Sequence, residues 1–65
     1  MKITVNGAAT EVAATTLAGA LDELGYGGAK VATAVNESFV PAAARAHLTL
    51  SPGDRLEIVA PRQGG

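Results

Sequence analysis

One stretch of this chain has the apolar spacing of an α-helix, and strand-like segments flank it on both sides. Leu17, Leu21 and Leu24 recur at the interval that places them on one face of a helix. A threonine pair precedes this stripe as a candidate N-cap, and Gly25 follows where a left-handed C-cap is expected. The pattern therefore predicts a single amphipathic helix whose leucines belong to the core.

The segment before the helix predicts a hairpin. Residues 2–6 alternate, with Ile3 and Val5 on one face, and Asn6-Gly7 is a strong turn signal. Residues 10–14 are expected to return antiparallel, with Val12 facing inward.

The segment after the helix predicts further short strands. The run 42–46 is ambiguous and could form a turn of helix. In the last run Leu56 and Ile58 are expected to face inward. The expected strands cover residues 30–36, 39–40, 47–50 and 55–60, with turns at residues 37–38 and 51–54.

The predicted order of elements defines a fold class. Two strands, a helix and further strands in so short a chain indicate an α+β fold, a mixed sheet of four to five strands packed on one helix. The first and last strands should lie side by side in parallel at its centre, which is the β-grasp, or ubiquitin-like, arrangement. We expect one β-grasp domain over residues 1–60 and a flexible tail over residues 61–65 that ends in Gly-Gly. A domain of this size buries only about 60% of its unfolded surface, which leaves little room for a deep catalytic cleft.

Charge and composition argue against several classes of function. The net charge is −1 with no basic stripe, and Tyr26 and Phe39 are the only aromatic residues, so we expect no nucleic-acid partner. No apolar run approaches the ~20 residues of a membrane span. The chain starts with a strand pattern rather than a signal peptide, so we expect a cytoplasmic protein.

Candidate catalytic and metal-binding residues are few. The sequence has no cysteine, and its lone His47 has no partners at ligand spacing, so we expect no catalytic residue and no metal site. Asp54 fits a turn, Glu57 fits a solvated strand face, and the pair Asp22-Glu23 is expected to be solvated near the helix end.

The tail suggests a chemistry that the protein itself does not catalyse. After Pro61, residues 62–65 include no large apolar side chain, and the glycine pair lacks Cβ atoms, so it can thread a narrow tunnel. An activating enzyme could bring the C-terminal carboxylate to a nucleotide's α-phosphate and form an acyl-adenylate. A persulfide or sulfide could then attack the acyl-adenylate and leave a terminal thiocarboxylate. The protein would then be a substrate and not an enzyme. A terminal Gly-Gly alone also fits a frayed end or a cloning scar.

Four stretches of the chain carry a resemblance to a known family: Val-Asn-Glu-Ser-Phe-Val-Pro at 35–41, Leu-Ser-Pro-Gly-Asp at 50–54, Glu-Ile-Val-Ala-Pro at 57–61 and Gln-Gly-Gly at 63–65. Together they resemble the ThiS family, the ubiquitin-like sulfur carriers of thiamine biosynthesis. The family usually has a basic residue where this chain has Ala42, and Arg45 is a candidate to compensate. The departure bears on partner contacts in that loop and not on the tail.

The resemblance implies partners and roles for the tail. It implies a ThiS-adenylating enzyme that uses ATP and magnesium, a persulfide sulfur donor, and a thiazole synthase that accepts the sulfur, while the carrier binds no cofactor. Gly65 would carry the adenylate and then the thiocarboxylate. Gly64 and Gln63 would lie in the partners' channels, and Arg62 would either contact an acidic partner surface or keep the tail in water.

A docking surface and the oligomeric state complete the expectations. Phe39, Val40 and Val59 are candidates for an exposed apolar patch, although a core position suits Phe39 equally well. We expect a monomer when the protein is free. Other readings stay open: a related carrier for molybdopterin, cysteine or tRNA thiolation, a modifier that forms isopeptide bonds, or a plain β-grasp interaction module.

Overall fold

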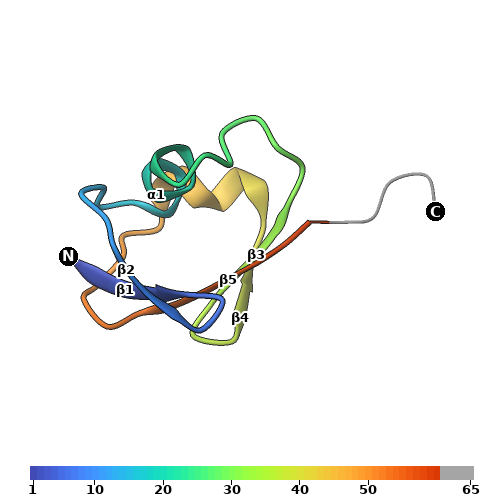
Figure 1. Cartoon of the computed structure of the whole chain (residues 1–65). Helices are drawn as coiled ribbons and strands as arrows, with labels where there is room; N and C mark the ends of the chain where they lie inside the picture. Colours follow the sequence, from blue (N-terminus) through green and yellow to red (C-terminus); the bar gives the residue numbers. More distant parts are fainter. Residues whose placement is uncertain (61–65) are drawn as a thin grey trace.

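The computed structural model describes residues 1–60 of the 65-residue chain and contains a five-stranded sheet with two helices on one of its faces (Figure 1). The alternating segments form the strands, and the leucine stripe forms the α-helix. The elements are β1 (Lys2–Val5), β2 (Ala8–Glu11), α1 (Leu17–Glu23), β3 (Ala32–Val35), β4 (Ser38–Val40), the 3-10 helix η1 (Ala42–His47) and β5 (Arg55–Val59).

The strand order across the sheet is β2-β1-β5-β3-β4. β1 and β5 pair in parallel, and every other pair in the sheet is antiparallel. The first and last strands therefore lie together at the centre, as the sequence predicted, and the α+β, β-grasp fold is confirmed. The expected tail over residues 61–65 lies outside the described residues.

Two hairpin turns with positive φ join the outer strands to the inner ones. The first is Asn6-Gly7, with φ of 50° and 85°, and it confirms the predicted turn. The second is Asn36-Glu37, with φ of 51° and 73°, one residue earlier than predicted, so that Ser38 already belongs to β4. Asparagine tolerates the left-handed region and glycine prefers it, whereas Glu37 occupies it at a steric cost.

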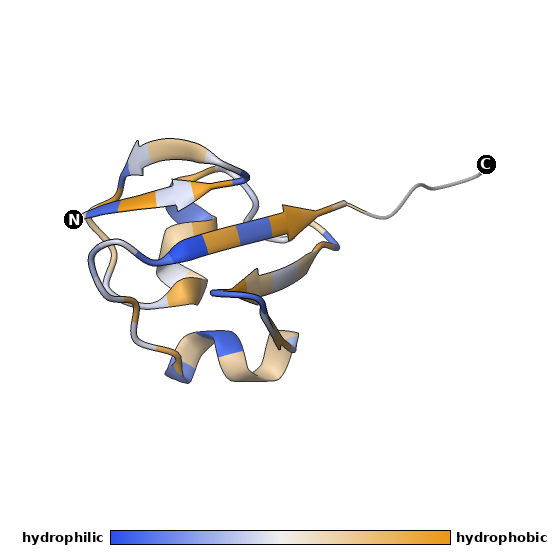
Figure 2. Cartoon of the chain, turned by 90° about the horizontal axis from the view of Figure 1, so that it is seen from below, coloured by the Kyte–Doolittle hydropathy of each residue, from blue (hydrophilic) through white to orange (hydrophobic). Residues whose placement is uncertain are grey.

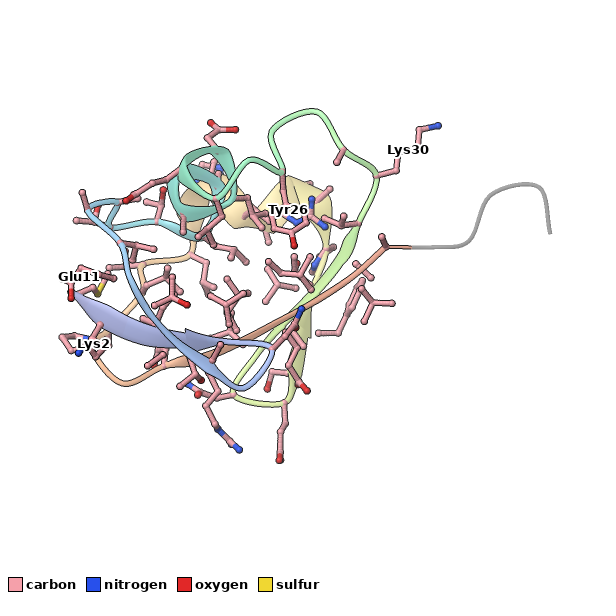
Figure 3. All side chains as sticks on the ribbon, viewed as in Figure 1. Lys2, Glu11, Tyr26 and Lys30 are labelled. Atoms are coloured by element: carbon pink, nitrogen blue, oxygen red, sulfur yellow. The ribbon has the colours of Figure 1, made fainter. Side chains whose placement is uncertain are left out.

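Helix α1 begins and ends as its sequence predicted. The Thr16 hydroxyl accepts a hydrogen bond from the Gly19 N–H (3.2 Å), and Gly25 has a φ of 92° just beyond the helix. Leu17 and Leu21 are buried and Leu24 is half-buried. The sheet and α1 enclose the core, while side chains such as Lys2, Glu11 and Lys30 point away from it (Figure 3). The buried apolar residues are Ile3, Val12, Leu17, Ala20, Leu21, Val40, Leu50, Leu56 and Ile58.

Glu23 corrects one expectation about the helix end. Its carboxylate is not merely solvated, because it accepts hydrogen bonds from the Ala13 N–H (2.9 Å) and the Ala14 N–H (3.0 Å). These donors lie in the link between β2 and α1, which leaves the sheet after Glu11. Glu23 thus ties the last turn of the helix to the chain that enters it.

The prediction of a strand at residues 47–50 was wrong. His47 ends η1 and is exposed, and Thr49 forms only an isolated bridge with Thr16. The Leu50 N–H donates to the Thr15 carbonyl (2.8 Å), so this segment pairs with the chain just before α1 and not with the sheet. The strand expected at 10–14 covers Ala8–Glu11, and the strand expected at 30–36 covers only Ala32–Val35. None of the helices within residues 1–60 has the length and apolarity needed to cross a membrane.

Candidate functional site

The outer face of the sheet, opposite the helices, changes character along β5. Leu56 and Ile58 point into the core, whereas Arg55, Glu57 and Val59 are exposed. Figure 2 shows this alternation of hydrophilic and hydrophobic residues, with the strand hydrophobic at its C-terminal end. The face is therefore charged where β5 begins and apolar where β5 leads into the tail.

The apolar end of this face forms a patch that spans three strands. Phe39 is 70% exposed and Val59 is 63% exposed, and these are the exposed large apolar side chains of residues 1–60. In the sheet register Phe39 lies beside Ala34, and Val59 lies beside Ala32. The short alanine side chains leave an open pocket between the two larger residues, with Glu57 at its margin. We call Ala32, Ala34, Phe39 and Val59 the apolar patch.

The structure corrects one member of the predicted docking surface and supplies two others. Val40 is only 6% exposed and belongs to the core, because adjacent residues of a strand face opposite sides and Phe39 faces out. The exposure of Phe39 resolves the alternative of a core position. Ala32 and Ala34 were missed, although the alternation around the buried Thr33 is the signal that could have placed them on the outer face.

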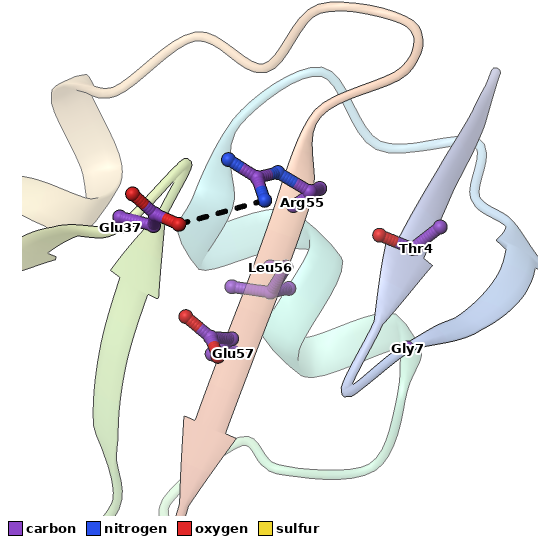
Figure 4. A pocket seen from close by; sticks show the side chains of 6 residues that line it. All are labelled: Thr4, Gly7, Glu37, Arg55, Leu56 and Glu57. Carbon is purple, nitrogen blue, oxygen red and sulfur yellow. Dashed lines mark ion pairs between the residues drawn. The ribbon is translucent and has the colours of Figure 1, made fainter.

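The charged end of the face is lined by polar side chains of β1, β5 and the second hairpin turn (Figure 4). The Arg55 guanidinium lies 3.7 Å from the Glu37 carboxylate, and both side chains are largely exposed, so this ion pair contributes little to stability. Thr4 and Glu57 complete the rim. This half of the face offers polar contacts beside the apolar patch.

Candidate metal ligands do not gather anywhere in the described part of the chain. Within residues 1–60, no three histidine, aspartate or glutamate side chains lie close enough together to hold a metal ion. Asp54 lies in the turn before β5, where its carboxylate accepts from the Ser51 N–H (2.8 Å), and Glu57 lies on the exposed face, as expected. His47 is also exposed, although on η1 rather than on a strand.

β5 is held on both sides by asparagine side chains from the two hairpin turns. On the β1 side, the Ile58 N–H donates to Asn6 Oδ1 (2.8 Å), and Asn6 Nδ2 donates to the Ile58 carbonyl (3.2 Å). On the β3 side, the Arg55 N–H donates to Asn36 Oδ1 (2.9 Å). The C-terminal part of β5, which precedes the tail, is thus fixed next to the apolar patch.

The predicted tail residues lie outside the described residues. Arg62, Gln63, Gly64 and Gly65 all follow Ala60, the last residue that the structure describes. The structure therefore locates where the tail starts. Val59, which belongs to the apolar patch, is the last residue of β5.

In the loop where the chain departs from the resembled family, Arg45 is bonded within the fold. Ala42 is exposed at the start of η1. Arg45 turns toward the sheet, where its Nε donates to the Thr33 hydroxyl (3.1 Å) and its Nη2 donates to the Val31 carbonyl (2.6 Å). Arg45 is thus used to fasten η1 to β3.

Comparisons with known proteins agree with this geometry. The model of the ThiS family matches residues 3–65. Among solved structures, the thiamine biosynthesis protein ThiS from Geobacter metallireducens is similar over the full length of both chains, with a TM-score of 0.84 and 26% sequence identity. No curated protein matches the sequence significantly.

Proposed function

Because the chain belongs to the ThiS family, we propose that it is a sulfur carrier for the synthesis of the thiamine thiazole, loaded at the carboxylate of Gly65. The observation that carries the proposal is the extent of the family match, which continues past β5 through Gln63, Gly64 and Gly65. The match therefore includes the residues whose chemistry the proposal requires, and not only the folded domain.

The proposed loading begins with activation of the terminus by a ThiS-adenylating enzyme. The Gly65 carboxylate attacks the α-phosphorus of ATP, magnesium pyrophosphate leaves, and an acyl-adenylate forms. The terminal sulfur of a persulfide then attacks the carbonyl carbon and displaces AMP. A thiol reduces the resulting acyl disulfide to the thiocarboxylate and is itself oxidised to a disulfide. ATP and magnesium belong to the enzyme, and the carrier contributes only its terminus and a surface for docking.

The apolar patch is the proposed docking surface for the enzymes that use the tail. It exposes Phe39 and Val59 next to the start of the tail, so a partner that covers the patch also has the tail within reach. Burying two large apolar side chains supplies binding free energy that does not depend on the tail. Arg62, Gln63 and Gly64 would then occupy the partner's channel, where side chains as small as those of glycine allow close passage.

The proposed acceptor of the sulfur is a thiazole synthase. Support for this client comes from the family and from the similarity to a thiamine biosynthesis protein. Growth of a thiazole-requiring mutant with this chain as its only sulfur carrier tests which pathway receives the sulfur. This test is separate from the test of thiocarboxylate formation. Rescue of molybdopterin synthesis, cysteine synthesis or tRNA thiolation in place of thiazole synthesis would reassign the carrier.

The test of loading is the intact mass after incubation with a ThiS-adenylating enzyme, ATP, magnesium, a persulfide donor and a thiol. We expect a gain that corresponds to one oxygen replaced by sulfur, localised to Gly65 by fragmentation and lost on hydrolysis. A chain that lacks Gly64 and Gly65 should fold normally and gain no mass. An unchanged mass of the full chain, with an enzyme that loads its own carrier, would contradict the proposal.

A further inference from the structure

The parallel ladder between β1 and β5 continues beyond the end of β1 through a side chain. The Thr4 N–H donates to the Asp54 carbonyl (3.0 Å), and the Asn6 N–H donates to the Leu56 carbonyl (2.9 Å). In a regular parallel ladder, the next bond would join the Ile58 N–H to the backbone carbonyl of Asn6. Because Asn6 has a φ of 50°, its backbone turns away from β5 at this point.

The side-chain amide of Asn6 takes the place of that missing strand residue. Its Oδ1 accepts from the Ile58 N–H (2.8 Å), and its Nδ2 donates to the Ile58 carbonyl (3.2 Å). Both backbone polar groups that Ile58 turns toward β1 are therefore bonded by one side chain. This is the last hydrogen-bonded position on that side of β5 among the described residues.

We propose that Asn6 is a positioning residue for the C-terminal tail. By holding Ile58 it fixes the end of β5, and with it the point beyond which the tail begins. A tail that starts from a fixed point loses less conformational freedom when its terminus enters an active site. The effect on activation rests on the proposed function, whereas the fixing of β5 does not.

The turn accepts either asparagine or glycine at position 6, so the turn alone does not require the side-chain amide. Glycine adopts positive φ with less strain, so a turn residue alone would be replaceable by glycine. The chain contains an internal comparison in Asn36, which occupies the corresponding place in the second hairpin turn with a φ of 51°. Asn36 Oδ1 accepts from the Arg55 N–H (2.9 Å), and Asn36 Nδ2 donates to Asp54 Oδ1 (3.0 Å). These bonds lie at the start of β5, away from the tail.

The experiment compares Asn6→Gly with Asn36→Gly. Each variant keeps a residue suited to positive φ and loses two side-chain hydrogen bonds to the region of β5, so both should lower the melting temperature. The loss should be larger in Asn6→Gly, because its bonds are partly buried and those of Asn36 are exposed. Amide hydrogen exchange should become faster at Ile58 only in Asn6→Gly. That variant should also lower kcat/KM for pyrophosphate release by the adenylating enzyme, on the order of tenfold, while Asn36→Gly leaves it unchanged.

A third variant separates the two bonds of the Asn6 amide. Asn6→Asp keeps an acceptor for the Ile58 N–H and loses the donor to the Ile58 carbonyl, so we expect a kcat/KM between those of the wild type and Asn6→Gly. Equal kcat/KM values for the two glycine variants, or unchanged exchange at Ile58 in Asn6→Gly, would overturn the proposal. If the wild-type chain releases no pyrophosphate, the proposed function fails, and the exchange at Ile58 still decides whether Asn6 fixes the end of β5.

Discussion

A buried hydroxyl on β3 joins the sheet to η1 and gives the sharpest test of how this small domain is held together. Thr33 is 1% exposed, and its Oγ1 donates to the Val40 carbonyl at 2.8 Å. The same oxygen accepts from Arg45 Nε at 3.1 Å. Replacing Thr33 by valine keeps the shape of the side chain and removes both hydrogen bonds.

The expected cost of Thr33→Val follows from these two bonds. The bond with the charged guanidinium contributes about 1.5–3 kcal/mol and the neutral bond about 1 kcal/mol. Burial of the added methyl group offsets about 0.8 kcal/mol of this loss in the free energy of unfolding. We therefore expect the free energy of unfolding to fall by about 2 kcal/mol, and the melting temperature of so short a chain to fall by roughly 10 °C.

Thermal and urea denaturation measure this loss, with Thr33→Ser as the matched control. The serine variant keeps the hydroxyl and loses only a methyl group, so it should lose about 1 kcal/mol. Arg45→Met removes the donor, and the double variant with Thr33→Val should lose less than the sum of the single variants because the two residues share a bond. The reasoning fails if the valine variant is as stable as the wild type, or more stable than the serine variant.

Three further outcomes are expected from the contacts described above. Phe39→Ser should leave the melting temperature within a few degrees of the wild type, because the side chain is exposed, and should raise the KM for the adenylating enzyme about tenfold; an unchanged KM would remove Phe39 from the docking surface. Glu23→Ala should lower the free energy of unfolding by about 1 kcal/mol in urea titrations and speed amide exchange at Ala13 and Ala14, whereas a solvated Glu23 would produce neither change. Leu17→Ala should cost about 3 kcal/mol in the same titrations, since the leucine is fully buried, and a loss below about 1 kcal/mol would contradict its place in the core.

Much of the fold could be predicted because its signals are local. The leucine stripe, the threonine cap and Gly25 are read within one helix, and the alternation of residues 55–60 identifies which side of β5 faces the core. The same alternation was available at Phe39-Val40, where consecutive strand residues must face opposite sides. Assigning both to one surface overlooked that rule, and the structure places only Phe39 outside.

The misplaced features depend on partners that are distant in the sequence. Residues 47–50 have a composition suited to a strand. The Leu50 N–H nevertheless donates to the Thr15 carbonyl before α1, and a local sequence pattern cannot predict a partner so far away. For the same reason Glu23 was expected to be solvated, and Arg45 was expected only as a candidate to compensate for the basic residue that is missing at Ala42. The donor to Glu23, the Ala13 N–H, and the acceptor from Arg45, the Val31 carbonyl, come within reach only after the chain has folded.

The position of β5 holds the C-terminal end of the described chain firmly in place. Chain ends often fray. A terminal strand at the edge of a sheet opens easily, because it has a neighbouring strand on one side only. Here the last strand is the central one, so opening it would break its pairing with both β1 and β3. β1 stops short of the end of β5, and the Asn6 amide bonds Ile58 beyond that point. A force applied to the chain beyond β5 would therefore act on the middle of the sheet. The domain should resist such a force better than a domain whose last strand lies at an edge.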